Sequence, residues 1–378
     1  MSLRPELRRA AIVLRALVER SGIDPARIDD VVFAQGYGNG EAPAIGRWAA
    51  LAAGLPVEVP GYQLDRRCGS GLQAVIDAAM MVQTGAADVV VAGGVESMSQ
   101  VEHYTLGVRG GVKMGGVTLH DRLTRGRLMS QPIARFGVIS GMIATAENVA
   151  TDCGITREAS DAYAARSHAR AAAAWEARRF DDEIVPMAVP QKRGEPVMFA
   201  RDEGIRVDAT PESLALLRPI EGGVVTAGNA SGVNDGACAL LLASEAAAAQ
   251  HGLTPRARVV GMATVGVPPR VMGIGPAPAT QKVLALTGLK IEQMDVIELN
   301  EAFAAQGLAV LHLLGLQDDD PRVNPNGGAI ALGHPLGASG ARLATTAVNQ
   351  LVRNGGRYAL CTMCIGVGQG IALVLERV

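Results

Sequence analysis

The sequence predicts an α/β fold built from two similar halves. The same succession of strand and helix patterns occurs twice, once before residue 94 and once after residue 258. Hydrophobic residues make up 48% of the chain and aromatic residues only 3%, with 46 glycines, which favours small-residue packing and many tight turns. A length of 378 residues is also too great for one undivided core.

The second half has the clearer pattern, because its apolar runs are separated by distinct turns. It opens with a strand, alternates strands with amphipathic helices, and closes with two strands around a glycine-rich turn. The predicted strands are 258–265, 296–299, 357–362 and 370–375, and the predicted helices are 279–287, 302–314 and 338–353.

The first half repeats this order, except that it opens with a helix. A short strand leads to Cys68 and an amphipathic helix follows it. The other predicted strands are 30–34, 88–92 and 237–243, and the other predicted helices are 7–20 and 44–53.

A long insertion separates the last two strands of the first half. It lies between Gly94 and Gly236 and contains basic loops, an alanine-rich helix over 157–179 and a proline-rich stretch. We expect it to form a subdomain above the first half. The predicted domains are 1–99 with 232–255, the insertion 100–231, and 256–378.

The start of the first half lacks the strand that opens the second half. We therefore expect one strand to be missing from the first sheet, which would leave unpaired backbone groups in its neighbour. Our hypothesis is that the chain begins at an internal methionine of a longer protein, or that the first half is remodelled. A complete first sheet would refute it.

Charge and cysteine content exclude several classes of protein. The 35 basic and 37 acidic residues nearly cancel, so no overall field favours nucleic acid or a membrane surface, and no run is long enough to span a bilayer. Five scattered cysteines argue against a disulfide framework. We favour neither redox nor zinc chemistry for the pair Cys361 and Cys364, predict no metal site, and expect a soluble cytoplasmic protein.

Cys68 lies between a strand and the start of a helix, next to Gly69 and Gly71. Free backbone N–H groups and the positive end of a helix dipole favour the thiolate form of such a cysteine. A buried structural cysteine at a tight turn fits this segment equally well.

Three further segments end predicted strands in the second half. His334 lies in a turn equivalent to that of Cys68, Asn300 follows a buried strand, and Cys364 follows another and begins a glycine-rich turn. Because ligand groups gather beyond the carboxyl ends of strands, we expect one site in which a base lies beside a nucleophile. A lone histidine is more often a packing residue, so the combination carries the prediction.

From about residue 7 to its end, the chain resembles the thiolases. Four long motifs of that family occur in the family order, and a fifth segment, 226–236, matches the end of the family's loop domain. The four are Cys-Gly-Ser-Gly at 68–71, Asn-Glu-Ala-Phe at 300–303, Gly-His-Pro-Leu-Gly-Ala-Ser-Gly at 333–340 and Cys-Ile-Gly-Val-Gly-Gln-Gly at 364–370.

The resemblance implies a five-layered αβαβα core and ping-pong acyl transfer between coenzyme A thioesters. Cys68 would take the acyl group, His334 would activate it, and Cys364 would exchange the proton of the acetyl-CoA α-carbon. One oxyanion hole would consist of His334 and a water held by Asn300, and the other of the backbone N–H groups of Cys68 and Gly366.

The resemblance also implies coenzyme A and acyl-CoA as substrates, with no permanently bound cofactor, and a homodimer or homotetramer. The implied coenzyme A contacts are Ser231, Met142, Ala227, Arg206, Ala302 and Phe303. Between Arg109 and Arg135 the chain has six basic residues against one acid, Asp121, and we interpret them as a solvated loop facing another subunit rather than as phosphate ligands. They are Arg109, Lys113, Arg122, Arg125, Arg127 and Arg135.

Several positions depart from the family pattern. Asp65 and the pair Met142-Ile143 replace an asparagine and Met-Gly, and Ile220 with Glu221 replaces an expected aromatic wall for the adenine. Gly141 stands where acetoacetyl-specific members often carry histidine, which favours a broader 3-ketoacyl-CoA thiolase of fatty acid metabolism.

The predicted activity is cleavage of 3-oxoacyl-CoA by coenzyme A to acyl-CoA and acetyl-CoA, or the reverse condensation. Three alternatives remain: an acetoacetyl-CoA-specific biosynthetic thiolase, a decarboxylating ketoacyl synthase, and an impaired thiolase-like protein that only binds acyl-CoA because its first sheet lacks a strand. The Cys-Ile-Gly motif at 364–366 favours a thiolase over a synthase.

Overall fold

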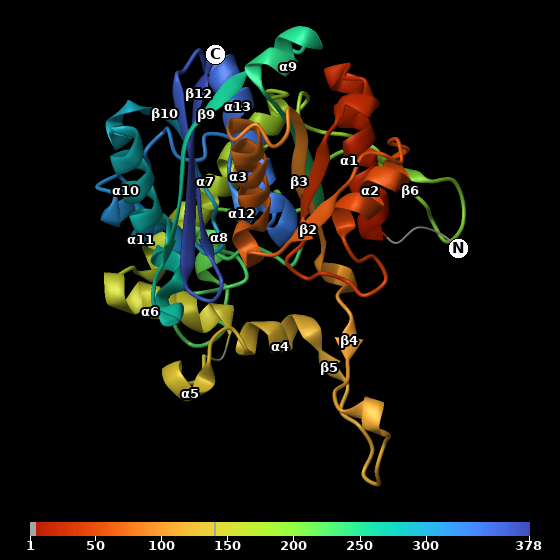
Figure 1. The fold of residues 1–378 in the computed structure, drawn as a ribbon. Coiled ribbons are helices and arrows are strands. Elements are labelled where there is room, and N and C mark those ends of the chain that lie inside the picture. The colour runs from red at the N-terminus through yellow and green to blue at the C-terminus, as the bar shows by residue number, and fades with distance from the viewer. Residues whose placement is uncertain (1–4, 140) are drawn as a thin grey trace.

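The computed structural model describes residues 5–139 and 141–378 and contains two four-stranded sheets (Figure 1). The first sheet has the order β2-β1-β3-β8, with β1 parallel to β2 and β3, and β8 antiparallel to β3. Its strands are β1 (Asp30–Ala34), β2 (Tyr62–Leu64), β3 (Val89–Ser97) and β8 (Asp235–Ala243).

The second sheet has the order β10-β11-β12-β9 and the same mixture of directions. β10 is parallel to β11, β11 is antiparallel to β12, and β12 is antiparallel to β9. A parallel bridge from Ile297 to Val323 takes the place that β2 has in the first sheet. The strands are β9 (Ala257–Gly266), β10 (Met294–Leu299), β11 (Tyr358–Ile365) and β12 (Gln369–Arg377).

Helices and sheets alternate in five layers, which confirms the predicted fold class. α1 (Pro5–Ser21) and α2 (Ile45–Ala53) cover the outer face of the first sheet. α3 (Ser70–Gln83) and α13 (Leu336–Asn354) lie between the two sheets, and α10 (Pro276–Thr287) with α11 (Ala304–Leu313) covers the second. Apolar side chains between these layers form the cores that hold both sheets in place.

Glycines let the two central helices approach each other backbone to backbone. A Cβ atom on Gly340 of α13 would lie 2.0 Å from the backbone nitrogen of Leu72, and one on Gly71 of α3 would lie 2.5 Å from the carbonyl oxygen of Gly337. No other residue fits at such distances. The crossing therefore brings the start of α3 directly beside the start of α13.

The two sheets differ at one edge. β12 pairs with β11 on one side and with β9 on the other, whereas β8 pairs with β3 alone among the described residues. β8 is accordingly half-buried along its whole length, and β12 is buried except at its ends. For the residues that the structure describes, the expectation that the first sheet lacks one strand beside β8 is confirmed.

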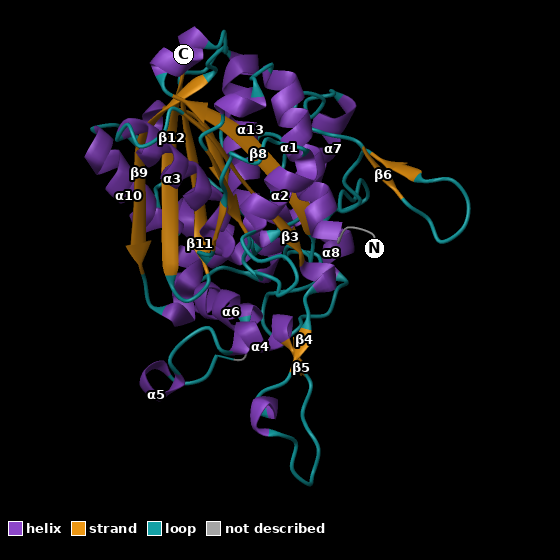
Figure 2. Cartoon of the chain, turned by 45° about the vertical axis from the view of Figure 1, so that its right-hand side comes forward, coloured by secondary structure: helices purple, strands orange, loops and turns teal. Residues whose placement is uncertain are grey.

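Residues 98–234 connect β3 to β8 outside both sheets. Two hairpins in this segment extend away from the layers, one formed by β4 and β5 and the other by β6 and β7 (Figure 2). The strands are β4 (His103–Tyr104), β5 (His120–Asp121), β6 (Met187–Val189) and β7 (Val197–Phe199), and the helices are α4 (Arg122–Leu128), α5 (Ile133–Phe136), α6 (Met142–Cys153), α7 (Arg157–Glu176) and α8 (Pro211–Ala215).

Two short helices complete the fold, α9 (Glu245–Gln250) after β8 and α12 (Ala329–Leu332) before His334. All five cysteines are free thiols, as expected from their spacing. Within the described residues no helix has the length and apolar character needed to cross a membrane.

Candidate active site

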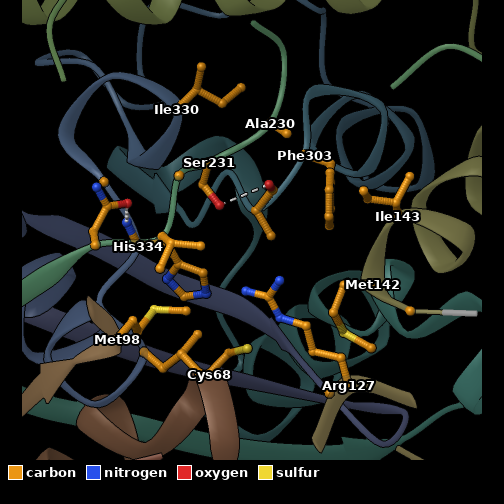
Figure 3. Close-up of a pocket in the computed structure, with 18 of the residues that line it drawn as sticks. Cys68, Met98, Arg127, Met142, Ile143, Ala230, Ser231, Phe303, Ile330 and His334 are labelled. Atoms are coloured by element: carbon orange, nitrogen blue, oxygen red, sulfur yellow. Dashed lines mark hydrogen bonds between the residues drawn. The ribbon is translucent and has the colours of Figure 1, made fainter. Parts of the chain in front are cut away.

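A cavity of about 560 Å³ lies where the ends of both sheets meet the 98–234 segment (Figure 3). Nine of the eleven predicted site residues line it, drawn from both halves and from the insertion. They are Cys68, Met142, Arg206, Ala227, Ser231, Ala302, Phe303, His334 and Gly366. The other two, Asn300 and Cys364, are fully buried behind its wall.

The Cys68 turn is held in one shape by local hydrogen bonds. The Ser70 hydroxyl accepts from the Arg66 N–H at 2.7 Å and donates to the Arg67 carbonyl at 2.6 Å, while the Asp65 carboxylate accepts from the Arg67 N–H. Arg67 itself has a left-handed backbone with φ 48°, which is uncommon for a residue with a side chain. The turn thus holds Cys68 just before α3, inside the cavity.

Opposing effects act on the Cys68 thiol. Burial raises its pKa, while the backbone N–H groups of Gly366 and of Cys68 itself and the positive charges of Arg67 and Arg127 act to lower it. The effect of burial is the largest of these, so the pKa of Cys68 is raised and the expected preference for the free thiolate is wrong. Deprotonation of Cys68 therefore requires a base at the time of reaction.

His334 is placed to be that base. Its Nδ1 lies 2.7 Å from the Ser339 hydroxyl, and its backbone N–H donates to the Asn234 side chain at 2.9 Å, so the ring is fixed from two sides. Burial and the charges of Arg342 and Arg127 lower its pKa to about 3. The imidazole is neutral at physiological pH and can accept a proton.

Asn300 lies directly after β10 and touches the other edge of the same ring. Its Nδ2 is 3.5 Å from His334 Nε2, and its Oδ1 has no hydrogen-bond partner in the described chain. A buried amide with an open acceptor can hold a water molecule. The sequence prediction that Asn300 acts together with His334 is consistent with this contact.

Cys364 lies within β11, which continues to Ile365, so the prediction that it follows the strand is wrong. Its side chain packs among Ala302, Phe303 and Met272 beneath the cavity. Burial, and the nearby Cys68, raise the pKa of its thiol, so it is a proton carrier rather than a thiolate.

The turn after β11 aims a donor at the nucleophile. The Gly366 N–H acts to lower the pKa of the Cys68 thiol, both residues line the cavity, and the next residue, Val367, has φ 70°. A left-handed backbone is an outlier for a β-branched residue, and it persists here because β11 and β12 fix both ends of the turn. Two backbone N–H groups, those of Cys68 and Gly366, therefore converge on one point.

The channel to the cavity runs between the 98–234 segment and the second half. Ser231 donates its N–H and its hydroxyl to the Ala302 carbonyl at 3.0 and 3.1 Å, and Ala230 forms a bridge with Phe303. Arg206 is exposed, and its backbone N–H donates to His168 at 3.2 Å. Ile220 lines the cavity, so an aliphatic wall stands where an aromatic was expected.

Sequence reasoning missed Tyr37, Met98 and Arg127, which also line the cavity. Tyr37 and Met98 closely follow β1 and β3, so the rule of strand ends could have identified them. Arg127 was interpreted as part of a solvated loop, which is wrong for this residue because α4 directs it inward (Figure 3). In the described chain, no group of three or more His, Cys, Asp or Glu side chains could hold a metal ion.

Comparison with protein families gives matches over almost the whole chain. Residues 6–246 match the model of the thiolase N-terminal domain, and residues 253–377 match that of the thiolase C-terminal domain.

Similar proteins of known name include two from bacteria. The chain is 52% identical to a β-ketoadipyl-CoA thiolase of Acinetobacter baylyi over 97% of its own length and 92% of the relative. It is also 52% identical to a 3-oxoadipyl-CoA/3-oxo-5,6-dehydrosuberyl-CoA thiolase of Escherichia coli, covering 98% of this chain and 93% of that one.

Solved structures include human mitochondrial 3-ketoacyl-CoA thiolase, with a TM-score of 0.93 and 39% identity, and the Bacillus anthracis acetyl-CoA acetyltransferase, with 0.93 and 41%. Both comparisons cover 99% of this chain and 93% of the other. Together with the family models and the cavity shared by Cys68 and His334, these matches show that the chain belongs to the thiolase family and is an acyltransferase acting on coenzyme A thioesters.

Proposed function

We propose that the protein cleaves 3-oxoacyl-CoA with coenzyme A, or runs the reverse condensation, through an acyl-Cys68 intermediate. The convergence of a protonated thiol, a neutral imidazole and two backbone N–H groups in one cavity is the observation that carries this proposal. A nucleophile, a base and oxyanion donors are the parts that acyl transfer needs.

In the first half-reaction His334 takes the thiol proton as the Cys68 sulfur attacks the 3-oxo carbon. The resulting oxyanion accepts hydrogen bonds from the N–H groups of Cys68 and Gly366, each contributing about 3 kcal/mol to the transition state. The bond between C2 and C3 then breaks, and the acyl group stays on Cys68 while an acetyl-CoA enolate leaves.

The enolate needs a proton and a second set of donors. Cys364, whose thiol is protonated, gives that proton to the enolate carbon, and His334 with a water on Asn300 stabilises the enolate oxygen. The Cys364 thiolate then recovers its proton from His334, which leaves the imidazole neutral. In the second half-reaction that imidazole takes the thiol proton of coenzyme A as its sulfur attacks acyl-Cys68, and it returns the proton to the Cys68 sulfur as acyl-CoA leaves. Coenzyme A and its thioesters are substrates here, and no permanently bound cofactor takes part.

Substrate binding is assigned to the channel above Cys68. We propose that Ser231, Ala302, Phe303, Met142 and Ala227 contact the pantetheine and acyl group, since all of them line the cavity. Exposed Arg206 is assigned to the adenine end. The two relatives named for 3-oxoadipyl-CoA make that six-carbon thioester the first substrate to test.

A steady-state assay tests the proposal directly. Thiolysis of acetoacetyl-, 3-oxohexanoyl-, 3-oxoadipyl- and longer 3-oxoacyl-CoA substrates should be measured with wild type and with Cys68→Ala. We expect cleavage of at least one substrate by wild type alone. Equal rates for the variant, or no cleavage of any substrate, would refute the assignment.

The protein is further proposed to be a cytoplasmic homodimer or homotetramer with a role in fatty acid metabolism. The β4–β5 arm supports assembly, because it extends from the body and exposes Leu106, Val112 and Met114 (Figure 2). Light scattering after gel filtration checks this. Replacing Val112 and Met114 by serine should lower the measured mass, and a wild-type monomer would contradict it.

A further inference from the structure

Arg127 lies at the reactive end of the cavity and has no hydrogen-bond or ion-pair partner among the described residues. It lies in the last turn of α4, is half-buried, and lines the same cavity as Cys68 and His334 (Figure 3). Its charge acts on Cys68, on His334 and on Tyr37, so the guanidinium lies close to the place where the acyl group is transferred.

The neighbouring arginines are all engaged. Arg122 binds Glu102 at 3.0 Å and the Gly38 carbonyl, and Arg125 lies 3.1 Å from the His120 ring. Arg67 donates to the Gly36 carbonyl at 2.8 Å and lies over the Tyr37 ring. Arg127 has no hydrogen bond or ion pair with any part of the chain that the structure describes.

An uncompensated guanidinium in this position is unfavourable unless an anion joins it. Apolar side chains, among them Met98, Met142 and Leu336, line the same cavity and offer the guanidinium no hydrogen-bond acceptor. The phosphates of coenzyme A do not fit this role, because they lie at the opposite end of that molecule from its thiol. Arg127, in contrast, is close enough to Cys68 and His334 for its charge to lower the pKa of both. The acyl group is the part of the substrate that can bring an anion to this end of the cavity.

We propose that Arg127 binds a carboxylate at the distal end of the acyl chain, so that the enzyme selects 3-oxoacyl-CoA substrates whose chain ends in a carboxylate. The inference rests on the proposed thiolase activity and adds the residue that determines specificity. A guanidinium can donate two parallel hydrogen bonds to one carboxylate. A chain that ends in a methyl group would leave the guanidinium without an acceptor.

The test compares two pairs of ligands that differ only at the chain end. Binding should be measured by calorimetry for wild type, Arg127→Gln and Arg127→Lys, with thioether analogues of adipyl-CoA and hexanoyl-CoA, in which a methylene group replaces the thioester carbonyl so that neither ligand can acylate Cys68. Arg125→Gln, a change on the same helix outside the cavity, is the matched control. Thiolysis of 3-oxoadipyl-CoA and 3-oxohexanoyl-CoA provides the parallel kinetic readout.

We expect Arg127→Gln to weaken binding of the adipyl-CoA analogue by about 10- to 100-fold, the range for a hydrogen bond to a charged group, and to leave binding of the hexanoyl-CoA analogue unchanged. Arg127→Lys should recover part of the loss, and Arg125→Gln should show none. Equal loss for both ligands, or no preference for the adipyl-CoA analogue in wild type, would overturn the inference. Discrimination in binding without cleavage of any 3-oxo substrate would instead refute the proposed activity and leave the inference standing.

Discussion

The two halves have the same topology but are not equally complete. β12 lies between two strands and is buried, whereas β8, in the same position of the first sheet, is half-buried and has β3 as its one partner strand among the described residues. The half that carries the nucleophile thus has the weaker sheet. The comparison directs attention to contacts from outside the first sheet, and the turn that carries Cys68 does pack against α13 and β11.

Two groups of contacts replace the missing pairing. α1 packs against β8, and Arg9 of α1 binds Asp235 at the start of β8 at 2.7 Å. Glu96, at the end of β3, accepts hydrogen bonds from the N–H groups of Gly36, Tyr37 and Gly337, and so ties the first half to the start of α13. The chemistry of the two halves is also unequal, with Cys68 in one and Cys364 in the other.

The largest effect should come from the nucleophile of the weaker half. Cys68→Ala should lower kcat for thiolysis by at least about 10⁴-fold, because no other side chain can carry the acyl group. Brief incubation with acetyl-CoA followed by mass spectrometry should find the acetyl group on Cys68. Its appearance on Cys364 or Cys361 would reverse the assignment of the two halves.

The next effect separates the two cysteines. Cys364→Ala should lower cleavage of the carbon–carbon bond by about 10²- to 10⁴-fold, the range for loss of a general acid or base. The same variant should still exchange the acetyl group between acetyl-CoA and labelled coenzyme A, since that step needs only Cys68 and His334. If exchange and cleavage fall together, the proposed division of roles is wrong.

Most of the fold could be predicted because it follows from local pattern and repetition. The apolar runs around 30–34, 88–92, 296–299 and 357–362 all form strands, and the unequal openings of the halves anticipated the open edge of β8. That Cys68 and His334 share one cavity could be predicted as well, because their turns occupy equivalent places in a repeated unit, whereas Gly366 was identified from the family motif.

Three other features could not be predicted, because they depend on contacts between segments that lie far apart in the sequence. Arg127 points into the cavity only because the path of the 98–234 segment carries α4 across it. The protonation state of Cys68 depends on the balance between burial, which raises its pKa, and the nearby N–H groups and arginines, which lower it. The spacing of residues in the sequence does not reveal that balance. The end of β11 was misplaced because Met363, Cys364 and Ile365 are as buried as the strand before them.

A smaller effect should follow from cutting the connection between halves at Glu96. Glu96→Ala leaves three N–H groups without their acceptor, and we expect the free energy of unfolding to fall by roughly 3 kcal/mol. Glu96→Gln, which keeps the shape and one acceptor, should lose less. Chemical denaturation measures the free energy of unfolding of both variants. Equal stability of the alanine variant and wild type would show that other contacts hold the two halves together.

The same residue gives a dependence on pH. Burial raises the pKa of Glu96 from 4.5 to about 7, so between these values the folded protein binds more protons than the unfolded chain. The Glu96 contribution to stability therefore falls as pH rises from about 4.5 to about 7. The stability of Glu96→Gln relative to wild type should rise over that window, and a constant difference would contradict the shift.

The smallest effect concerns the edge itself and needs no substitution. In an antiparallel pair alternate N–H groups point away from the partner, so about every second amide of β8 should exchange rapidly with solvent while the interior amides of β12 stay protected. Hydrogen exchange with mass spectrometry or NMR measures this. Uniform protection along β8 would mean that its outer edge is covered in solution.

The connections between paired strands also bear on the order in which the molecule folds. Only residues 366–368 join β11 to β12, whereas residues 98–234 separate β3 from its partner β8. Closing a long loop is entropically costly and slow, so we expect the β11–β12 hairpin to form early and the β3–β8 pair late. Pulsed hydrogen exchange during refolding would reveal the order. If it holds, the turn that contains Gly366 exists before the 98–234 segment closes over it, and the cavity wall that this segment supplies, Arg127 and Ser231 included, is the last part of the site to be put in place.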